Sequence, residues 1–473
     1  MQLTKDLESN ITLLNKELKV KKNYDIIYRR VDIGGRKGCF YFIDGFTKDE
    51  MMQRLLQAFQ EIKPEDMVST AKEFSRKFLP YGEVDIAGDK DKVKKSLLSG
   101  VPCLLIEGYA ETLMIDFRSY PARGVEQPEK EKALRGSKDG FVETIVFNTA
   151  LIRRRIRSTE LIMENYSIGK SSKTDVVLSY MEDRVDKKAL EEVKNKLNKI
   201  KIDALTMNGE SLAECLYQHK WYNPFPKFKY SERPDTTAAS ILEGSIILIV
   251  DNSPAALILP TSIFDIMEEA DDYYFPPITG TYLRLSRFVI NFFAVFLTPG
   301  FVLLFMNPDW IPKGLSFIRI TDAIHIPIVV QFLILEFAID GLRMASINTP
   351  SMLSTPLSVV AAIVLGDYTV SSGWFNSEIM LYMAFVVIAN YSQVSFELGY
   401  ALKFMRILLL ILTGVFGIYG FIAGTGILIA AIVCNKSIAG RSYIYPLIPF
   451  DGRQLMRRFF RVSLPRSEKE KRV

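Results

Sequence analysis

The chain divides into a charged part and an apolar part. Lys, Arg, Asp and Glu are frequent through residues 1–285 and become scarce over residues 288–434. A soluble protein spreads its apolar residues over amphipathic elements instead of collecting them at one end. Several apolar segments approach the ~20 residues that a transmembrane helix needs. The pattern predicts a membrane protein with a large water-facing N-terminal part, and it disfavours the alternative of a large buried helical core.

Five apolar segments can be drawn in the membrane part: 288–306, 323–339, 353–366, 379–395 and 407–434. The third is short and follows Pro350 and Pro356, which favours a broken or re-entrant element. The tail after Cys434 is rich in Lys and Arg, which predicts that it lies in the cytoplasm. If the N-terminal part is also cytoplasmic, the number of full crossings is even. We expect four spans and one re-entrant segment, or six spans if 407–434, which is broken by glycines, folds as two.

Short apolar runs alternate with charged helices in the N-terminal part, which is typical of an α/β fold. Pairs of strands around short turns are expected at 101–118 and at 245–260. The predicted fold class is an α/β cytoplasmic region of two small subdomains, followed by an all-α polytopic transmembrane domain. We predict these segments: a helix and connector (1–38), a first α/β subdomain (39–120), a linker (121–140), a second α/β subdomain (141–280), the transmembrane domain (281–434) and a basic cytoplasmic tail (435–473).

Composition and charge limit the classes of protein to which the chain can belong. The mean hydropathy of +0.12 is high for a chain with 24% charged residues, and a net charge of +5 over 473 residues gives no indication of nucleic-acid binding. The first ten residues are polar, so we expect no secretory signal and an N-terminal part that stays in the cytoplasm.

Catalytic and metal-binding signals are lacking. The four cysteines form no CxxC pair and the only histidines, His219 and His325, lie far apart, which disfavours zinc, disulfides and a histidine-centred triad. No glycine-rich phosphate loop joins a strand to a helix. We therefore predict no enzymatic activity, no metal and no cofactor.

Ionisable residues within apolar segments are costly and usually functional. Glu336 and Asp340 lie four residues apart on one helix face, with Arg343 about one turn further on. A ring of such carboxylates would favour cations, so these three residues are the candidate ion path. An ion pair between Asp340 and Arg343 at the membrane edge is an equal alternative for that pair. An inter-helix partner is the alternative for Glu336.

Other charged residues and several glycines of this part are predicted to have structural or lipid-contacting roles. Glu397, Lys403 and Arg406 flank a short connector, and snorkelling or loop charges are favoured for them over pore groups. Glycines recur at short spacing along the last apolar segment, which favours close helix packing over a hinge; they are Gly414, Gly417, Gly420 and Gly424. Residues 452–466 interleave arginines with apolar residues, which predicts contact with lipid head groups in preference to a solvated tail; the arginines are Arg453, Arg457, Arg458 and Arg461.

Ordered blocks along the whole chain resemble a known family. In the N-terminal part they are RGSKDGFVETIVFNTALIRRRIRS (135–158), IGKSSKTDVVLSYM (168–181), PFPKFKYSERPD (224–235), ILEGSIILIVDNSPAALILP (241–260) and EADDYYFPP (269–277). In the membrane part they are TGTYLRLSRF (279–288), LTPGF (297–301), ILEFAIDGLRMA (334–345) and FELGYALKFMR (396–406). These blocks resemble those of the spore germinant-receptor A-subunit (GerA) family. Residues 348–378 depart from the Leu-Pro-Lys-Pro run of the nutrient receptors and are similar to the stage V sporulation protein AF branch, which puts direct nutrient binding in doubt.

The resemblance implies a function and a location. It implies a multi-pass protein in the inner membrane of the spore, with both termini on the core side, that forms a homo-oligomer, with a pentamer suggested. Its implied partners are the lipid bilayer, other spore germination membrane proteins and monovalent cations. The first hypothesis is a subunit of a cation channel, or of a channel-like assembly, that takes part in germination. The alternatives are a secondary transporter or solute-binding subunit, although no inverted repeat is visible, and a membrane scaffold for other germination proteins.

Overall fold

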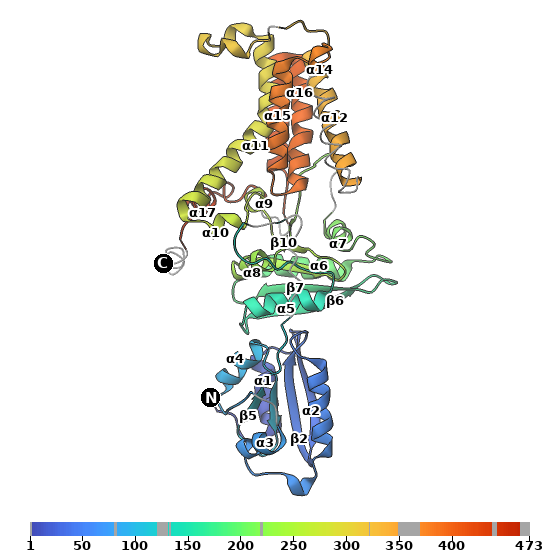
Figure 1. Ribbon diagram of the computed structural model, residues 1–473, viewed down its shortest axis with the longest axis vertical. Helices are drawn as coiled ribbons and strands as arrows, with labels where there is room; N and C mark the ends of the chain where they lie inside the picture. Colours follow the sequence, from blue (N-terminus) through green and yellow to red (C-terminus); the bar gives the residue numbers. More distant parts are fainter. Residues whose placement is uncertain are drawn as a thin grey trace. The chain divides into compact units, whose positions relative to one another are not determined.

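The chain folds into two compact units (Figure 1). One unit comprises Met1–Gln218 and Phe228–Thr261, and the other comprises His219–Lys227 and Ser262–Val473. The computed structural model describes residues 2–79, 83–120, 131, 134–217, 221–320, 322–348, 369–437 and 442–463. The predicted third apolar segment, 353–366, lies outside these residues.

The first unit begins with a five-stranded antiparallel sheet whose two faces are covered by helices. Its elements are α1 (Leu7–Glu17), β1 (Ile26–Ile33), β2 (Arg36–Ile43), α2 (Asp49–Glu61), α3 (Ala71–Phe78), β3 (Val84–Ala87), α4 (Lys90–Leu98), β4 (Cys103–Ile106) and β5 (Thr112–Ile115). The strand order is β1-β2-β4-β5-β3. Successive side chains of a strand point to opposite faces, so Tyr41 packs with α1 and α4 while Phe40 packs with α2 and α3.

A second five-stranded antiparallel sheet follows in the same unit. Its elements are α5 (Ile145–Arg155), β6 (Leu161–Ile168), β7 (Thr174–Met181), α6 (Lys187–Lys199), α7 (Asn208–Leu216), β8 (Lys229–Ser231), α8 (Pro234–Leu242), β9 (Ile246–Val250) and β10 (Ala256–Leu259). The strand order is β6-β7-β9-β10-β8. The predicted α/β character of the N-terminal region is confirmed, and so are the hairpins predicted at 101–118 and 245–260, which are β4–β5 and β9–β10.

The two subdomains repeat one fold. Both run helix, two strands, two helices, strand, helix, two strands, and their sheet orders correspond strand for strand. Asn10 of α1 and Asn148 of α5 are both buried, and each side chain bonds the backbone N–H and carbonyl of the residue six positions earlier. Gly100 and Gly244 end α4 and α8 with φ of +91° and +98°. These shared details indicate an internal duplication.

A buried ion pair joins the two repeats. The guanidinium of Arg153 is fully buried and donates two hydrogen bonds to Asp25, with N···O distances of 2.7 and 3.0 Å. Beside it the hydroxyls of Tyr24 and Thr149 lie 2.8 Å apart. Breaking a buried ion pair by removing one partner costs ~3–5 kcal/mol, so this contact holds the repeats together firmly.

The second unit is helical. Its elements are α9 (Ile263–Ile266), α10 (Asp271–Tyr274), α11 (Pro277–Met306), η2 (Pro308–Trp310), η3 (Lys313–Ile318), α12 (Ile328–Asn348), α14 (Thr369–Ser371), α15 (Ser377–Tyr391), α16 (Phe396–Val433) and α17 (Gly452–Phe459). Helices α11, α12, α15 and α16 pack side by side (Figure 1). Among the described helices, α11 and α16 are long and apolar enough to cross a membrane, and α15 is a shorter apolar helix.

Helix α16 is folded back on itself at Gly417. The backbone there has φ +59° and ψ −133°, a conformation that only glycine adopts without strain. A Cβ built on Gly424 would lie 3.3 Å from Cα of Leu409, whereas in a straight helix these residues would be separated by about 22 Å. The segment 407–434, preferred above as a single span, therefore belongs to two antiparallel arms, 396–416 and 418–433.

Contacts fix the direction of each helix in the bundle. Helix α12 is antiparallel to the first arm of α16, because Val329 approaches Gly414 while Asp340 pairs with Lys403. Helices α12 and α15 instead begin at the same end, where the amide of Gln331 donates to the side chain of Asn376 across 2.9 Å. Helix α11 runs along the first arm of α16 in the same direction, because Ala294 accepts from Arg406 while Met306 approaches Gly417. It therefore begins at the end where the second arm of α16 finishes.

Candidate functional site

Four ionisable side chains meet between α12 and the first arm of α16. Helix α12 supplies Glu336 and Asp340, one turn apart on one face, and α16 supplies Lys403 and Arg406 at a spacing that also shares a face. Because the two helices run antiparallel, the two carboxylates lie opposite the two cations. Surrounding residues such as Leu335, Leu402 and Leu409 are apolar and buried.

Glu336 is held from two sides. Nε of Arg406 donates to Oε1 of Glu336 across 2.7 Å, and Nζ of Lys403 lies 3.4 Å from Oε2. A third helix contributes as well, since Nη1 of Arg406 donates to the carbonyl of Ala294 in α11 across 2.6 Å. Glu336, Lys403 and Arg406 are all at most 5% exposed. These contacts tie α11, α12 and α16 together through one buried carboxylate.

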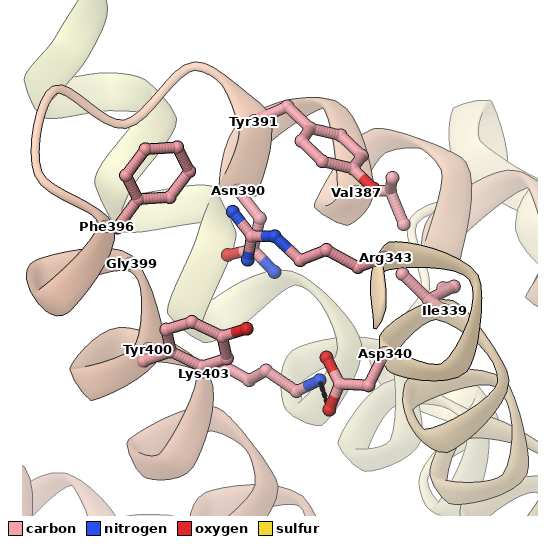
Figure 2. Close-up of a pocket in the computed structure, with 10 residues that line it drawn as sticks. All are labelled: Ile339, Asp340, Arg343, Val387, Asn390, Tyr391, Phe396, Gly399, Tyr400 and Lys403. Carbon is pink, nitrogen blue, oxygen red and sulfur yellow. Dashed lines mark ion pairs between the residues drawn. The ribbon is translucent and has the colours of Figure 1, made fainter. Parts of the chain in front are cut away.

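Asp340 and Arg343 lie beside this cluster and line a hollow (Figure 2). Nζ of Lys403 is 2.5 Å from Oδ2 of Asp340, whose side chain is 33% exposed. The guanidinium of Arg343 lies over three aromatic rings, those of Tyr391, Phe396 and Tyr400. Asp340 thus pairs with Lys403 of α16, whereas the sequence offered Arg343 of its own helix as the alternative partner.

The prediction that Lys403 and Arg406 are snorkelling or loop charges is wrong, because both are buried and ion-paired. The carboxylates of Glu336 and Asp340 are matched by two cations, so the cluster is neutral in sum. A buried charge is tolerated only when it is paired and hydrogen-bonded. The sequence contains one indication of this pairing. The acidic residues 336 and 340 and the basic residues 403 and 406 each lie about one helical turn apart in two apolar helices that face each other.

The candidate packing glycines occupy different places. A Cβ on Gly414 would lie 2.6 Å from the side chain of Val329 in α12, and one on Gly424 would lie 2.5 Å from the side chain of Leu409 in the opposite arm. A Cβ on Gly420 would overlap the carbonyl oxygen of Leu412. These three glycines stand at close helix approaches, whereas Gly417 forms the bend itself.

The candidate head-group arginines lie on or next to α17, at the beginning of α11. Arg458 forms ion pairs with Asp265 and with Glu268, the latter at 2.9 Å, and Arg461 donates to the carbonyl of Tyr273 across 2.6 Å. The carbonyl of Arg457 accepts from Arg284 across 2.8 Å. Arg453 is exposed. Lipid contact stays a prediction, and Arg453 is the residue best placed for it.

Comparison with known proteins identifies the family. Residues 13–473 match the family described as the Bacillus/Clostridium GerA spore germination protein. The match spans nearly the entire chain, and the chain belongs to this family.

Individual relatives agree with that assignment. The chain is 35% identical to the stage V sporulation protein AF of Bacillus subtilis (strain 168) over 94% of this chain and 90% of the relative. It is 27% identical to the spore germination protein KA of the same organism over 99% of this chain and 86% of the relative. It also matches the crystal structure of the N-terminal domain of the A subunit of the Bacillus megaterium spore germinant receptor GerK3, with 27% identity, 55% of this chain, 96% of that chain and a TM-score of 0.43.

Proposed function

We propose that this chain is a membrane subunit of a spore germination complex, and that it forms a channel-like homo-oligomer that conducts or gates monovalent cations. The observation that carries the proposal is the ionic cluster of buried Glu336, Lys403 and Arg406 with half-buried Asp340 among apolar helices. Ionisable residues at membrane depth mark ion paths and relays far more often than they serve packing alone. Neither an enzymatic role nor a cofactor enters the proposal.

The geometry supports a gate in which the carboxylates are neutralised at rest. Asp340 is the more exposed carboxylate and meets only one cation, at the edge of the hollow. Glu336 is enclosed by Arg406 and Lys403. Movement of Lys403 away from Asp340 would leave a carboxylate beside the path, where it would attract cations. Glu336 would keep α12 and α16 in register during that movement.

The direction of the helices supports a location for both ends of the chain. The first residues of α11 contact the α17 region, since Arg284 donates to the carbonyl of Arg457, so the N-terminal part and the basic tail leave the bundle at one end. By the positive-inside tendency that end faces the cytoplasm, which in a spore is the core side of the inner membrane. We propose a multi-pass arrangement there, in contact with other germination membrane proteins, with a pentamer as the expected assembly.

The hollow beside the cluster favours a second candidate function, that of a transporter or solute-binding subunit. It is lined by charged, amide and aromatic side chains together, a combination that suits a small polar solute. A solute-binding subunit would show saturable uptake or binding of a solute, whereas a channel subunit would pass cations without one. A scaffold would do neither.

Cation flux across liposomes that contain the purified chain tests the proposal. We would compare the wild type with Asp340→Asn and Glu336→Gln. Glu378→Gln is the matched control, because Glu378 begins α15 and meets Ser377 outside the cluster. The proposal expects a potassium leak that both cluster variants change and the control does not. Unchanged flux in correctly assembled Asp340→Asn protein would reject a place for Asp340 on the ion path. Absence of a potassium leak from the wild type would reject conduction by this chain alone.

A further inference from the structure

Among the described residues, no carboxylate pairs with the guanidinium of Arg343. Its guanidinium lies 5.5 Å from the ring centre of Tyr391 and 5.1 Å from those of Phe396 and Tyr400. The only ion pair among the residues of Figure 2 joins Asp340 to Lys403. Across the part of the chain that the structure describes, the side chain of Arg343 meets these rings and no hydrogen-bond acceptor.

The aromatic rings orient this guanidinium without using its N–H groups. Cation–π attraction to the three rings, whose centres lie 5.1–5.5 Å away, holds the group and leaves its N–H donors without an oxygen acceptor. A half-buried donor without an acceptor loses the hydrogen bonds that it would make in water. The arrangement is therefore prepared for an acceptor that comes from outside the chain.

The hollow next to Arg343 has the lining that an anion requires. It contains Lys403, Asp340 and the amide of Asn390 besides Arg343, so its charged groups sum to one positive charge. Oδ1 of Asn390 is a buried acceptor without a donor in the described residues, so only the NH₂ group of this amide could donate to an anion. The remaining wall is apolar and includes Ile339 and Val387.

We propose that this hollow is a binding site for a singly charged oxyanion, a phosphate group or a carboxylate, with Arg343 as its principal ligand. The planar fork of an arginine matches such anions in bidentate fashion. The site lies near the end of α12 and at the connection between α15 and α16, which is the end of the bundle where α11 begins. A phospholipid head group and a free oxyanion can both reach that position. The inference does not depend on ion conduction.

Binding measured on the full-length chain in detergent tests the site. The probes are dihexanoylphosphatidylglycerol and its deacylated form, glycerophosphoglycerol, which share the singly charged phosphodiester and differ in the acyl chains. The readout is the melting temperature as a function of probe concentration. We expect saturable stabilisation of the wild type. Arg343→Gln should weaken apparent affinity about tenfold or more, because charge-assisted hydrogen bonds contribute ~1.5–3 kcal/mol. Arg343→Lys should keep part of the affinity.

Matched variants separate the site from general effects of charge and folding. Arg319→Gln removes an exposed arginine of the same unit whose guanidinium donates only to the carbonyl of Pro308, and it should bind as the wild type does. Val387→Phe narrows the hollow while keeping Arg343, and it should lose binding while its melting temperature without probe stays near that of the wild type, which excludes a folding defect. Binding of both probes identifies a free oxyanion as sufficient, and binding of the lipid alone identifies a membrane source. Failure of both probes to bind, or equal binding by Arg343→Gln, would overturn the proposal.

Discussion

Glu336 is compatible with an apolar bundle only because another helix neutralises it. Arg406 and Lys403 approach it from α16, and Arg406 also bonds the carbonyl of Ala294 in α11. An uncompensated ion in such surroundings would cost several kcal/mol. The same contacts that make the charge tolerable join three helices, so the charge of this residue and the stability of the bundle are linked.

Glu336→Gln should therefore destabilise the membrane unit. The substitution keeps the shape but leaves Arg406 without its carboxylate, and loss of one partner of a buried pair costs ~3–5 kcal/mol. Loss of helical circular dichroism on heating in detergent measures the effect. Glu378→Gln is the control and should change stability by less than about 0.5 kcal/mol. Equal melting of the two variants would mean that the pair contributes nothing to stability.

Ion pairs of Glu182 also join the two N-terminal repeats, and their contribution to stability depends on pH. Glu182 of the second repeat pairs with Lys19, at 2.6 Å, and with Lys22 of the first. The hydrogen bond from Lys19, with that from Lys22, lowers the pKa of Glu182 from 4.5 to about 2. A carboxylate with a lowered pKa stabilises the fold above its ordinary pKa, and this contribution disappears as the pH falls from 4.5 towards 2.

The wild type should accordingly melt above Glu182→Gln at pH 7, and the difference should shrink as the pH falls below 4.5. The groups are partly exposed, so each pair contributes less than about 1 kcal/mol. Melting curves of both proteins at pH 7, 4 and 3 provide the measurement. A difference that is constant over this range would exclude Glu182 as the titrating group.

At the scale of the element, the bend in α16 depends on one glycine. Gly417→Ala should cost ~1–3 kcal/mol because its backbone conformation disfavours any Cβ. Gly426→Ala is the matched control: a Cβ there meets nothing within 4 Å, and alanine in a helix interior is favoured over glycine by ~1 kcal/mol. We expect the first variant to melt below the wild type and the second at or above it. Similar behaviour of both would indicate a straight helix at Gly417.

The elements that could be predicted from the sequence are those specified by local pattern. The β4–β5 and β9–β10 hairpins follow from short continuous apolar runs around turns, and Glu336 and Asp340 stand out because they interrupt an apolar helix. The duplication of the α/β fold was not visible, because the repeats keep the positions of their apolar residues while most identities differ; Asn10 and Asn148 are among the few shared markers.

Long-range pairing explains the parts of the site that were not predicted. Lys403 and Arg406 lie near a connector in the sequence, where long cations usually reach for water. Their burial follows from the antiparallel packing of α12 and α16, which local pattern does not reveal. From its spacing, Gly417 is predicted to allow close helix packing, as the neighbouring glycines do. Spacing alone does not distinguish a glycine that permits close approach from one that permits a positive φ.

At the scale of the whole molecule, the helix directions predict which parts of the chain share one side of the membrane. Helix α11 begins and α16 ends at one end of the bundle, and residues 307–327 connect α11 to α12 at the other. Helices α12 and α15 both begin at that other end. Helix α12 has 21 residues, about 31 Å of helix, which is close to the thickness of the hydrocarbon core.

Thiol labelling of cells that produce the chain tests this arrangement. Cys215 and Cys434 are exposed in the structure, whereas Cys39 and Cys103 are buried. A membrane-impermeant maleimide should label Ser316→Cys, in η3 of the connection between α11 and α12, from outside intact cells. It should reach Cys215 and Cys434 only after permeabilisation, because the positive-inside tendency predicts that the side with the basic tail faces the cytoplasm. Labelling of Cys434 in intact cells would show that the bundle crosses an odd number of times or lies in the opposite orientation, and either result would remove the basis for a cytoplasmic tail next to α11.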